Sequence, residues 1–525
     1  MLELALFLAL LVAPTGASDE ARPRSGAPYV VVALDRDDPT ATGFAPTIER
    51  VVEFHGARLL ECASSELEDL AAPLRDLGPD NVLFVVPPAV LDAALHRRVL
   101  ALARAVDADP FTDFAFGYLT ARDGEALASL WERTVALHEH GLASKRWAGL
   151  FVTSGMPSTI FRNHIPGAAL RAGFGGESVG LACVESDPEV LAFAARELRR
   201  LESASVLTVT GNGDPQGIWL FDGRRNLDRT KHWEYDPARV GSDPEGVMPR
   251  LLADDVRALH LASPIVWSGT CHSAIPARAF VENDIVSTFG RTERPTLHVL
   301  AADESLALAW LDAGAAALLA PIGANHGMAV DREVEFALSN GASLGEAVKS
   351  TYDDLVLAQG PDLYLDVPRD GVAPERREPI MAGGGANRIL IGDPALAPFV
   401  PTRPAVPLTV TTTATFDGVE RVEVLFERDG SFDPDAWDMY GKDRSRDWRI
   451  AARVRLPARG VDAGTRLDVT VDAASDAGEP LPYTLGPCAI EWWRGECVLH
   501  VTANAPRNAV EGVPTRARFV ATFAR

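Results

Sequence analysis

Two apolar segments of the sequence end in residues that could do chemistry. Residues 206–214 read VLTVTGNGD and pass from an apolar stretch into Asn212 and Gly213. Residues 264–272 read PIVWSGTCH, and their apolar stretch leads to Cys271. In an open parallel sheet, functional groups gather at the carboxyl ends of the central strands. If these two strands are adjacent, Asn212, Gly213 and Cys271 share one cleft.

A cysteine at such a strand end has two interpretations. The sequence predicts a helix from near Ser273, and a helix N-terminus lowers the pKa of a nearby thiol and favours the nucleophilic thiolate. Alternatively, Cys271 is a buried structural residue, since cysteine is among the most buried residue types. Both interpretations remain open at this point.

The chain has five cysteines, so at least one stays outside any disulfide. Cys488 and Cys497 flank a predicted hairpin and could bridge in an oxidising compartment. No pair of cysteines or histidines has the spacing of a zinc site, so we predict no structural zinc.

The elements that must position these residues alternate between strands and helices. The predicted strands are 29–34, 82–86, 114–119, 147–152, 206–209, 265–267, 315–319 and 387–394, the last running into a turn. The predicted helices are 47–56, 91–106, 187–201, 303–313 and 344–358. Such alternation predicts an α/β fold with a doubly wound, mostly parallel sheet.

The character of the sequence changes after a proline-rich linker at residues 399–407. Beyond it, short strand-like runs are separated by Gly, Asp and Pro, which is typical of an Ig-like β-sandwich. We therefore predict an N-terminal α/β subdomain over 28–141, a second subdomain over 142–399 and a C-terminal sandwich over 400–525.

Residues 1–17 resemble a signal peptide, because an apolar run is followed by small residues. Glu3 and the absence of a basic residue before that run leave an alternative start open. The formal net charge of −23 would repel nucleic acid and anionic lipid, so neither is an expected partner. No stretch predicts a membrane span, and the chain is expected to be secreted or to lie in the cell envelope.

The order of these segments resembles that of gingipain-type cysteine peptidases, a branch of the caspase-like fold. In that family one strand ends in His-Gly, and a later strand ends in a small residue followed by the nucleophilic Cys, as at Thr270-Cys271. Further similar segments are 114–123, 314–319 with 344–347, and the closing 389–396, which contains Gly-Asp-Pro. The resemblance implies a caspase-like sheet in two subdomains, a following Ig-like domain, and oxyanion donors from the N–H groups of Gly213 and Cys271.

One departure from the family concerns the general base. Asn212 stands where the family has its catalytic His, 59 residues before Cys271, close to the interval of about 50 in caspases. An amide has no basicity near neutral pH, and general acid–base assistance is worth roughly 10²–10⁴ in rate. His326 is the preferred substitute on the geometry of strand ends, with His232 and His272 as weaker alternatives and a surface histidine as the plainer interpretation of each.

Two functions follow from this pattern. The first is a secreted cysteine-type endopeptidase with Cys271 as nucleophile, impaired by Asn212 and acting on protein or peptide substrates. The second is a catalytically inactive caspase-like scaffold, a pseudoenzyme that serves as a binding or assembly module. Neither requires a cofactor, although acidic loops such as residues 35–38 leave a structural calcium ion open.

Overall fold

The computed structural model describes the chain from residue 28 onward, with gaps. The described residues are 28–142, 146–152, 178–183, 199–211, 213–219, 250–277, 279–282, 296–323, 334, 337–338, 341–359, 364–365, 380–381, 385–399, 408–415, 418–427, 449–457, 466–474, 484–493, 496–504 and 516–524. The predicted signal peptide and most of the predicted helix at 187–201 lie outside these residues.

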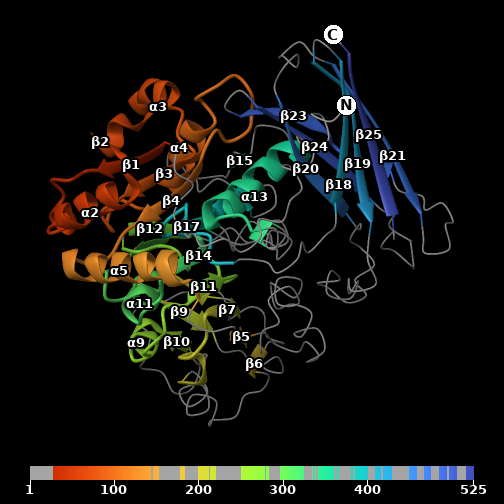
Figure 1. Ribbon diagram of the computed structural model, residues 1–525. Coiled ribbons are helices and arrows are strands. Elements are labelled where there is room, and N and C mark those ends of the chain that lie inside the picture. Colours follow the sequence, from red (N-terminus) through yellow and green to blue (C-terminus); the bar gives the residue numbers. More distant parts are fainter. Residues whose placement is uncertain are drawn as a thin grey trace.

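A ten-stranded sheet forms the centre of the α/β part (Figure 1). Its strands, in spatial order, are β2 (Arg58–Cys62), β1 (Tyr29–Leu34), β3 (Asn81–Val85), β4 (Ala115–Leu119), β17 (Arg388–Ile391), β14 (Ala317–Pro321), β11 (Ile265–Ser268), β7 (Val206–Gly211), β5 (Trp147–Val152) and β6 (Ser178–Cys183). Every neighbouring pair is parallel except β14 and β17, which are antiparallel. The predicted α/β fold with a mostly parallel sheet is confirmed.

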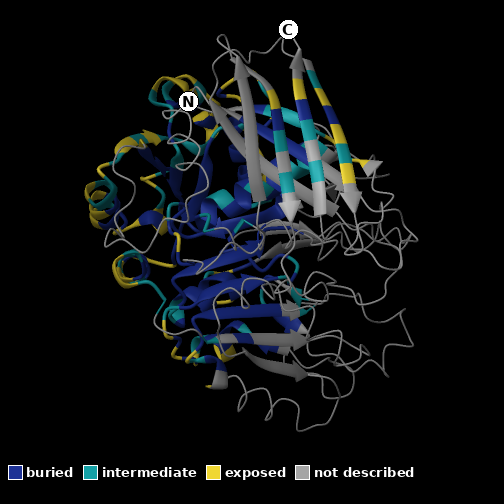
Figure 2. Cartoon of the chain, turned by 45° about the vertical axis from the view of Figure 1, so that its right-hand side comes forward, coloured by how far each residue is buried: buried dark blue, intermediate teal, exposed yellow. Residues whose placement is uncertain are grey.

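Burial explains which strands the sequence predicts well. Strand β1 reads YVVVAL and is buried throughout, as expected for a strand covered on both faces. Buried residues, dark blue in Figure 2, fill the centre of this sheet. Strand β2 was not predicted, because it lies at the sheet edge and exposes several of its residues. Strand β6, at the opposite edge, was also missed.

Helices cover both faces of the sheet. Helices α2 (Ala45–His55), α5 (Gly124–His140) and α11 (Leu306–Asp312) lie side by side on one face, next to the short α9 (Ala253–Arg257) (Figure 1). Helices α4 (Ala93–Ala103) and α13 (Leu344–Gln359) pack together on the other face, where His96 approaches Tyr352. Helix α3 (Ala71–Leu77) follows a 3-10 turn at Ser64–Leu70 that α4 contacts. Among the described residues no helix is both long and apolar enough to cross a membrane.

The C-terminal part is all β, with two antiparallel four-stranded sheets (Figure 1). The first contains β18 (Leu408–Thr415), β19 (Gly418–Glu427), β25 (Arg516–Ala524) and β21 (Arg466–Ala474). The second contains β20 (Arg449–Pro457), β24 (Glu496–Asn504), β22 (Thr484–Leu485) and β23 (Ala489–Trp493). The change to all-β structure is as predicted, and the Ig-like assignment stays a prediction.

The hairpin of β23 and β24 excludes the suggested disulfide. Trp492 lies opposite Cys497 in this ladder, and Cys488 precedes β23 by one residue. Cys488 is therefore four residues along the strand from the position opposite Cys497, or roughly 13 Å at the usual rise per residue. A disulfide needs Cα atoms within about 7 Å, so Cys488 and Cys497 do not bridge each other.

A buried polar network joins the C-terminal strands to the α/β part. Lys349 of α13 lies 2.7 Å from Asp353 and 2.5 Å from Glu491 of β23. Glu491 also contacts His500 of β24 at 2.7 Å, and the His500 ring stacks on Phe111. Each of the four ionisable side chains is at most 6% exposed, so the two parts share a desolvated interface.

Candidate functional site

The two strands that carry the candidate chemistry are direct neighbours. Strands β7 and β11 pair in parallel, from Val206 opposite Ile265 to Val209 opposite Ser268. The N–H of Gly269 continues the pairing and donates to the carbonyl of Val209 at 2.7 Å. Both strands therefore deliver their following residues to the same edge of the sheet, as predicted.

Beyond the strands, Gly213 and Thr270 are in contact. A Cβ atom built on Gly213 would lie 2.5 Å from Cγ2 of Thr270 and 2.5 Å from the carbonyl oxygen of Gly217. Both distances are far below van der Waals contact, so this close approach requires glycine. Gly213 therefore lies beside the residue that precedes Cys271.

The predicted helix after Cys271 is wrong. Residues 271–274 form consecutive turns, and no helix starts within residues 271–277. His272 has a φ of 56°, which is left-handed and incompatible with an α-helix, and Pro276 follows closely. The argument that a helix dipole lowers the thiol pKa of Cys271 therefore does not apply.

Short hydrogen bonds hold this turn. The hydroxyl of Ser273 donates to the carbonyl of Thr270 at 2.6 Å and lies 2.8 Å from the hydroxyl of Ser268. The N–H of Thr270 donates to the same Ser268 hydroxyl at 3.2 Å. From β17, the buried Arg388 donates from Nη1 to the carbonyl of Ser268 at 2.8 Å. The end of β11 is therefore held by hydrogen bonds within the turn and by the hydrogen bond from Arg388.

His272 connects the turn to the loop after β14. Its N–H donates to the carbonyl of Gly323 at 2.9 Å, and the N–H of Ala274 donates to Pro321 at 2.9 Å. His272 and Thr270 are buried, whereas Cys271 between them is only half-buried. Left-handed residues other than glycine cost about 1–3 kcal/mol and cluster at active sites. The strained turn therefore presents Cys271 at the carboxyl edge of the sheet.

The structure brings together only part of the predicted site. It places Gly213 and Cys271 at one edge, with the loop that leads toward His326 fastened next to them. Asn212, His326 and His232 lie outside the described residues.

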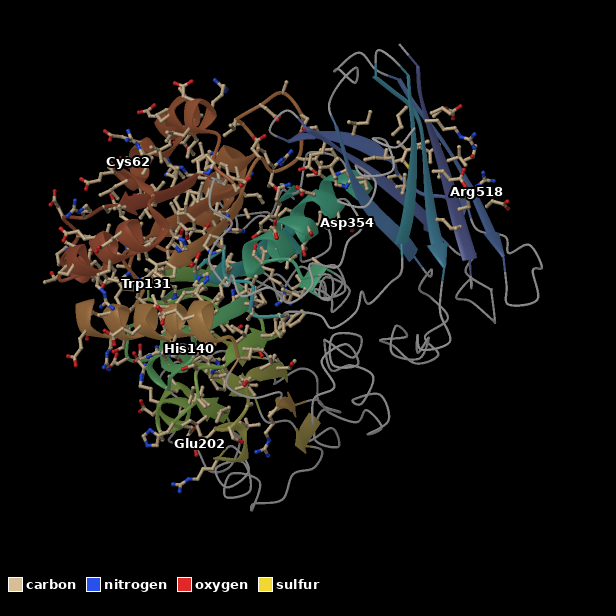
Figure 3. All side chains as sticks on the ribbon, viewed as in Figure 1. Cys62, Trp131, His140, Glu202, Asp354 and Arg518 are labelled. Atoms are coloured by element: carbon tan, nitrogen blue, oxygen red, sulfur yellow. The ribbon has the colours of Figure 1, made fainter. Side chains whose placement is uncertain are left out.

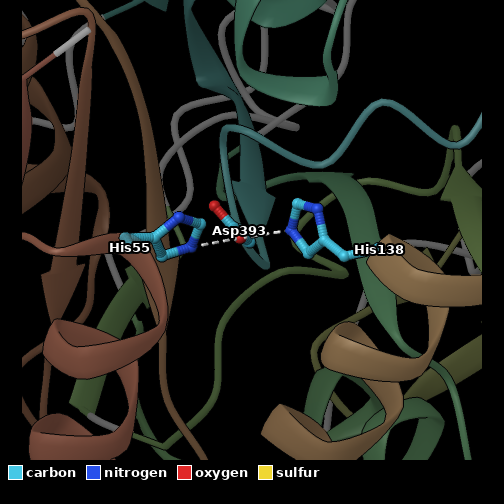
Figure 4. A group of neighbouring side chains, drawn as sticks. All are labelled: His55, His138 and Asp393. Carbon is cyan, nitrogen blue, oxygen red and sulfur yellow. Dashed lines mark hydrogen bonds and ion pairs between the residues drawn. The ribbon is translucent and has the colours of Figure 1, made fainter. Parts of the chain in front are cut away.

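A second cluster, His55, His138 and Asp393, was missed by sequence reasoning (Figure 4). Nε2 of His55 lies 2.8 Å and Nε2 of His138 lies 2.7 Å from the same oxygen, Oδ2 of Asp393. The other oxygen, Oδ1, accepts hydrogen bonds from the hydroxyl of Tyr29 at 2.7 Å and the N–H of Ala395 at 2.9 Å. The exposed fractions of the three side chains are 1%, 7% and 0%.

The two histidines favour the ionised form of Asp393. Burial by itself raises the pKa of Asp393, but the charge of His55 and the hydrogen bonds from His138 and His55 outweigh it and hold the pKa well below its usual value. The pKa of Tyr29 is raised well above 10 by burial and by the adjacent carboxylate. Tyr29 is therefore a neutral hydrogen-bond donor to a buried anion.

The sequence holds little signal for this cluster. His138 and Asp393 are 255 residues apart, and His55 and Asp393 are 338 apart. No spacing rule connects such positions. The available hints were a histidine in the last turn of two amphipathic helices and the aspartate of the Gly-Asp-Pro segment.

Cys62 contrasts with Cys271. It ends β2 at the outer edge of the sheet (Figure 3), away from the central strands. Burial and the nearby carboxylates of Asp35, Glu66 and Asp69 raise its pKa to about 11. Its thiol is therefore protonated at neutral pH and a weak nucleophile.

The fold and site together define an α/β protein with a cysteine presented at the carboxyl edge of its central parallel strands. No protein-family model matches the chain, and no curated protein matches it.

Several solved structures are similar to the chain. One is a crystal structure of the Arg-specific cysteine proteinase gingipain R, with 12% identity, a TM-score of 0.41 and 92% of each chain covered. Another is the complex of Porphyromonas gingivalis RgpB pro- and mature domains, with 13% identity, a TM-score of 0.43, and 90% of this chain and 93% of that chain covered. A third is described as a protease, with 10% identity, a TM-score of 0.37, and coverages of 91% and 92%.

Proposed function

We propose that the chain is a gingipain-type, caspase-like cysteine endopeptidase with Cys271 as nucleophile. One observation carries the proposal, namely the parallel register of β7 and β11 that sets Gly213 against Thr270. It supports the proposal because backbone N–H donors of an acyl-transfer site must lie close to the nucleophile to stabilise the oxyanion. The half-buried Cys271, in a strained turn between buried neighbours, supports the same role.

The roles of the residues follow from this arrangement. The thiolate of Cys271 attacks the peptide carbonyl, and the N–H groups of Gly213 and Cys271 stabilise the oxyanion. In the sequence, Asn212 stands where the family has its base, and an amide cannot take up a proton near neutral pH. The enzyme is therefore impaired unless His326, beyond the loop that Gly323 fastens to the turn, replaces it.

The second candidate function is an inactive scaffold that binds or assembles with other proteins. Two observations favour it. The sequence has Asn212 in place of a base, and a turn rather than a helix follows Cys271. Both remove a factor that would favour the thiolate.

Residues 1–17 act as a signal peptide, 28–141 and 142–399 are two α/β subdomains, and 400–525 forms an Ig-like sandwich. Export places the chain outside the cytoplasm or in the cell envelope, where protein or peptide substrates reach Cys271. No cofactor takes part in the reaction, and a structural calcium ion at acidic loops is not needed for it.

Competitive labelling of cysteines tests the proposal. The full-length protein is treated at pH 7 with a mixture of peptide acyloxymethyl ketones, and labelled sites are quantified by peptide mass spectrometry. Cys62 is an internal control, because a pKa of about 11 leaves only about one thiolate in 10⁴ at pH 7. We expect Cys271 to react at least about tenfold faster than Cys62. Equal rates at the two cysteines would remove Cys271 as a nucleophile.

A further inference from the structure

We propose that His55, His138 and Asp393 form a binding site for a zinc-type divalent cation. Their three ligand atoms lie within 4.8 Å of one another, and both imidazoles point at the carboxylate (Figure 4). Two imidazole nitrogens and one carboxylate oxygen form a donor set that zinc accepts. Calcium and magnesium prefer oxygen ligands alone. This inference is independent of the proposed peptidase function.

The distances require only a small adjustment. Zinc bonds of about 2.0–2.2 Å in a tetrahedron separate the ligand atoms by about 3.3 Å. The Nε2–Oδ2 separations are 2.8 Å for His55 and 2.7 Å for His138. Moving each ring outward by about half an ångström would bring both nitrogen–oxygen separations to this value, and the two ring nitrogens lie within 4.8 Å of each other.

The local charge favours a cation. Asp393 is fully buried, and within the described part of the chain its ion-pair partners are these two histidines, with no lysine or arginine. A buried carboxylate needs a positive partner to offset its desolvation. His55 is the last residue of α2, and His138 lies in the last turn of α5. The partial negative charge at both helix ends adds to the attraction for a cation.

The coordination would leave one open position. Tyr29 and Ala395 both donate to Oδ1 of Asp393, so the carboxylate presents Oδ2 alone. Three protein ligands plus one water is the pattern of zinc sites that exchange a ligand. His138, with 7% of its side chain exposed, is the member closest to solvent.

The surroundings of His55 set the strength of binding. Its Nδ1 is buried and has no hydrogen-bond partner among the described residues. Zinc-bound histidines usually donate from the second ring nitrogen, and loss of that partner costs about 10–100-fold in affinity. We therefore expect exchangeable zinc that a chelator removes. Because binding requires an unprotonated Nε2 on each ring, affinity should fall as the pH is lowered.

Metal loading of the full-length protein, without a polyhistidine tag, tests this site. The protein is stripped with EDTA, loaded with zinc chloride, desalted and analysed by inductively coupled plasma mass spectrometry. We expect about one zinc ion per chain for the wild type. His138→Gln keeps an N–H donor for Asp393 but supplies no zinc ligand, so it should retain the fold and lose the ion.

His140→Ala is the matched control. His140 lies on the same helix, two residues beyond His138, and 76% of its side chain is exposed (Figure 3). This variant should bind as much zinc as the wild type. A folded wild type without stoichiometric zinc, or a His138→Gln variant that retains it, would overturn the proposal. If His138→Gln does not fold, the visible absorption spectrum of cobalt-loaded wild type is measured instead. We expect the bands of tetrahedral Co²⁺, and their absence would also overturn the proposal.

Discussion

At the scale of single residues, Gly213 occupies a position with no room for a side chain. Gly213→Ala would bring a methyl group to 2.5 Å from both Gly217 and Thr270. We expect the strand ends to separate, with a loss of about 1–3 kcal/mol of unfolding free energy and much slower labelling of Cys271. Adding Thr270→Ser removes one of the two clashes and should restore part of both losses. Unchanged stability and labelling in Gly213→Ala would contradict the close approach.

Asp393 leads to a prediction about acid stability. Its pKa is lowered in the folded protein, so its ionised form stabilises the fold above about pH 4, the pKa of an unfolded aspartate. That contribution is lost as the pH falls below this value toward the folded pKa. In metal-free protein, Asp393→Asn should lower the unfolding free energy at pH 7 by about 3 kcal/mol.

Urea denaturation between pH 7 and pH 2.5 measures this effect. The difference between wild type and Asp393→Asn should shrink as the pH falls below 4. A constant difference over the whole range would show that the Asp393 charge does not stabilise the fold.

Single residues also show what sequence reasoning can reach. The position of Gly213 and Cys271 at one edge of the sheet was predictable, because residues that follow neighbouring parallel strands meet at that edge. The cluster of His55, His138 and Asp393 depends on how two helices and a turn pack. No local pattern encodes that packing, so only the structure revealed it.

At the scale of elements, the loop between α4 and β4 contains a crowded group of aspartates. Burial, Asp107 and Asp109 together raise the pKa of Asp113 to about 8. A carboxyl group with a raised pKa favours folding while it is protonated, and this contribution declines as the pH rises from about 4 through 8. The unfolding free energy of the wild type should therefore fall between pH 5 and pH 9.

Asp113→Asn should weaken that pH dependence, because the amide does not ionise. Thermal unfolding of both proteins at pH 5, 7 and 9 is the measurement. As the pH rises, the stability of the variant should increase relative to that of the wild type. A parallel pH dependence in the two proteins would show that Asp113 does not titrate in this range.

Elements differ in how well the sequence predicts them. Strands such as β1 and β11 are continuous apolar runs, so composition alone identifies them. The prediction of a helix after Cys271 was wrong because the left-handed turn at His272 depends on a contact with Gly323, far along the chain. The reversed direction of β17 against β14 likewise depends on sheet assembly.

At the scale of the whole molecule, Lys349 holds the C-terminal strands to the α/β part. Lys349→Met leaves Glu491 and Asp353 buried with one partner fewer. Removing one member of a buried ion pair typically costs about 3–5 kcal/mol. We expect faster release of a C-terminal fragment in limited proteolysis. Arg518→Ala, which breaks a partly exposed pair with Glu423, is the control and should be cleaved like the wild type.

The assembly as a whole was only partly predictable. The sequence indicated an α/β part followed by an all-β part, because the period and length of apolar runs change after residue 407. The interface between the parts was not foreseen. Lysine and glutamate are almost never fully buried unless they are paired, and histidine is buried only in some proteins. The burial of Lys349, Glu491 and His500 therefore depends on tertiary packing.

In the proposed function, Cys271 and the backbone at Gly213 form an acyl-transfer site that lacks only a base at residue 212. The most direct test of this proposal is the rate at which Asn212→His hydrolyses casein, compared with the rate for Asn212→Gln. We predict that the histidine variant exceeds wild type and Asn212→Gln by roughly 10²-fold or more, and that adding Cys271→Ala abolishes the gain. A folded Asn212→His protein with no more activity than Asn212→Gln would contradict it.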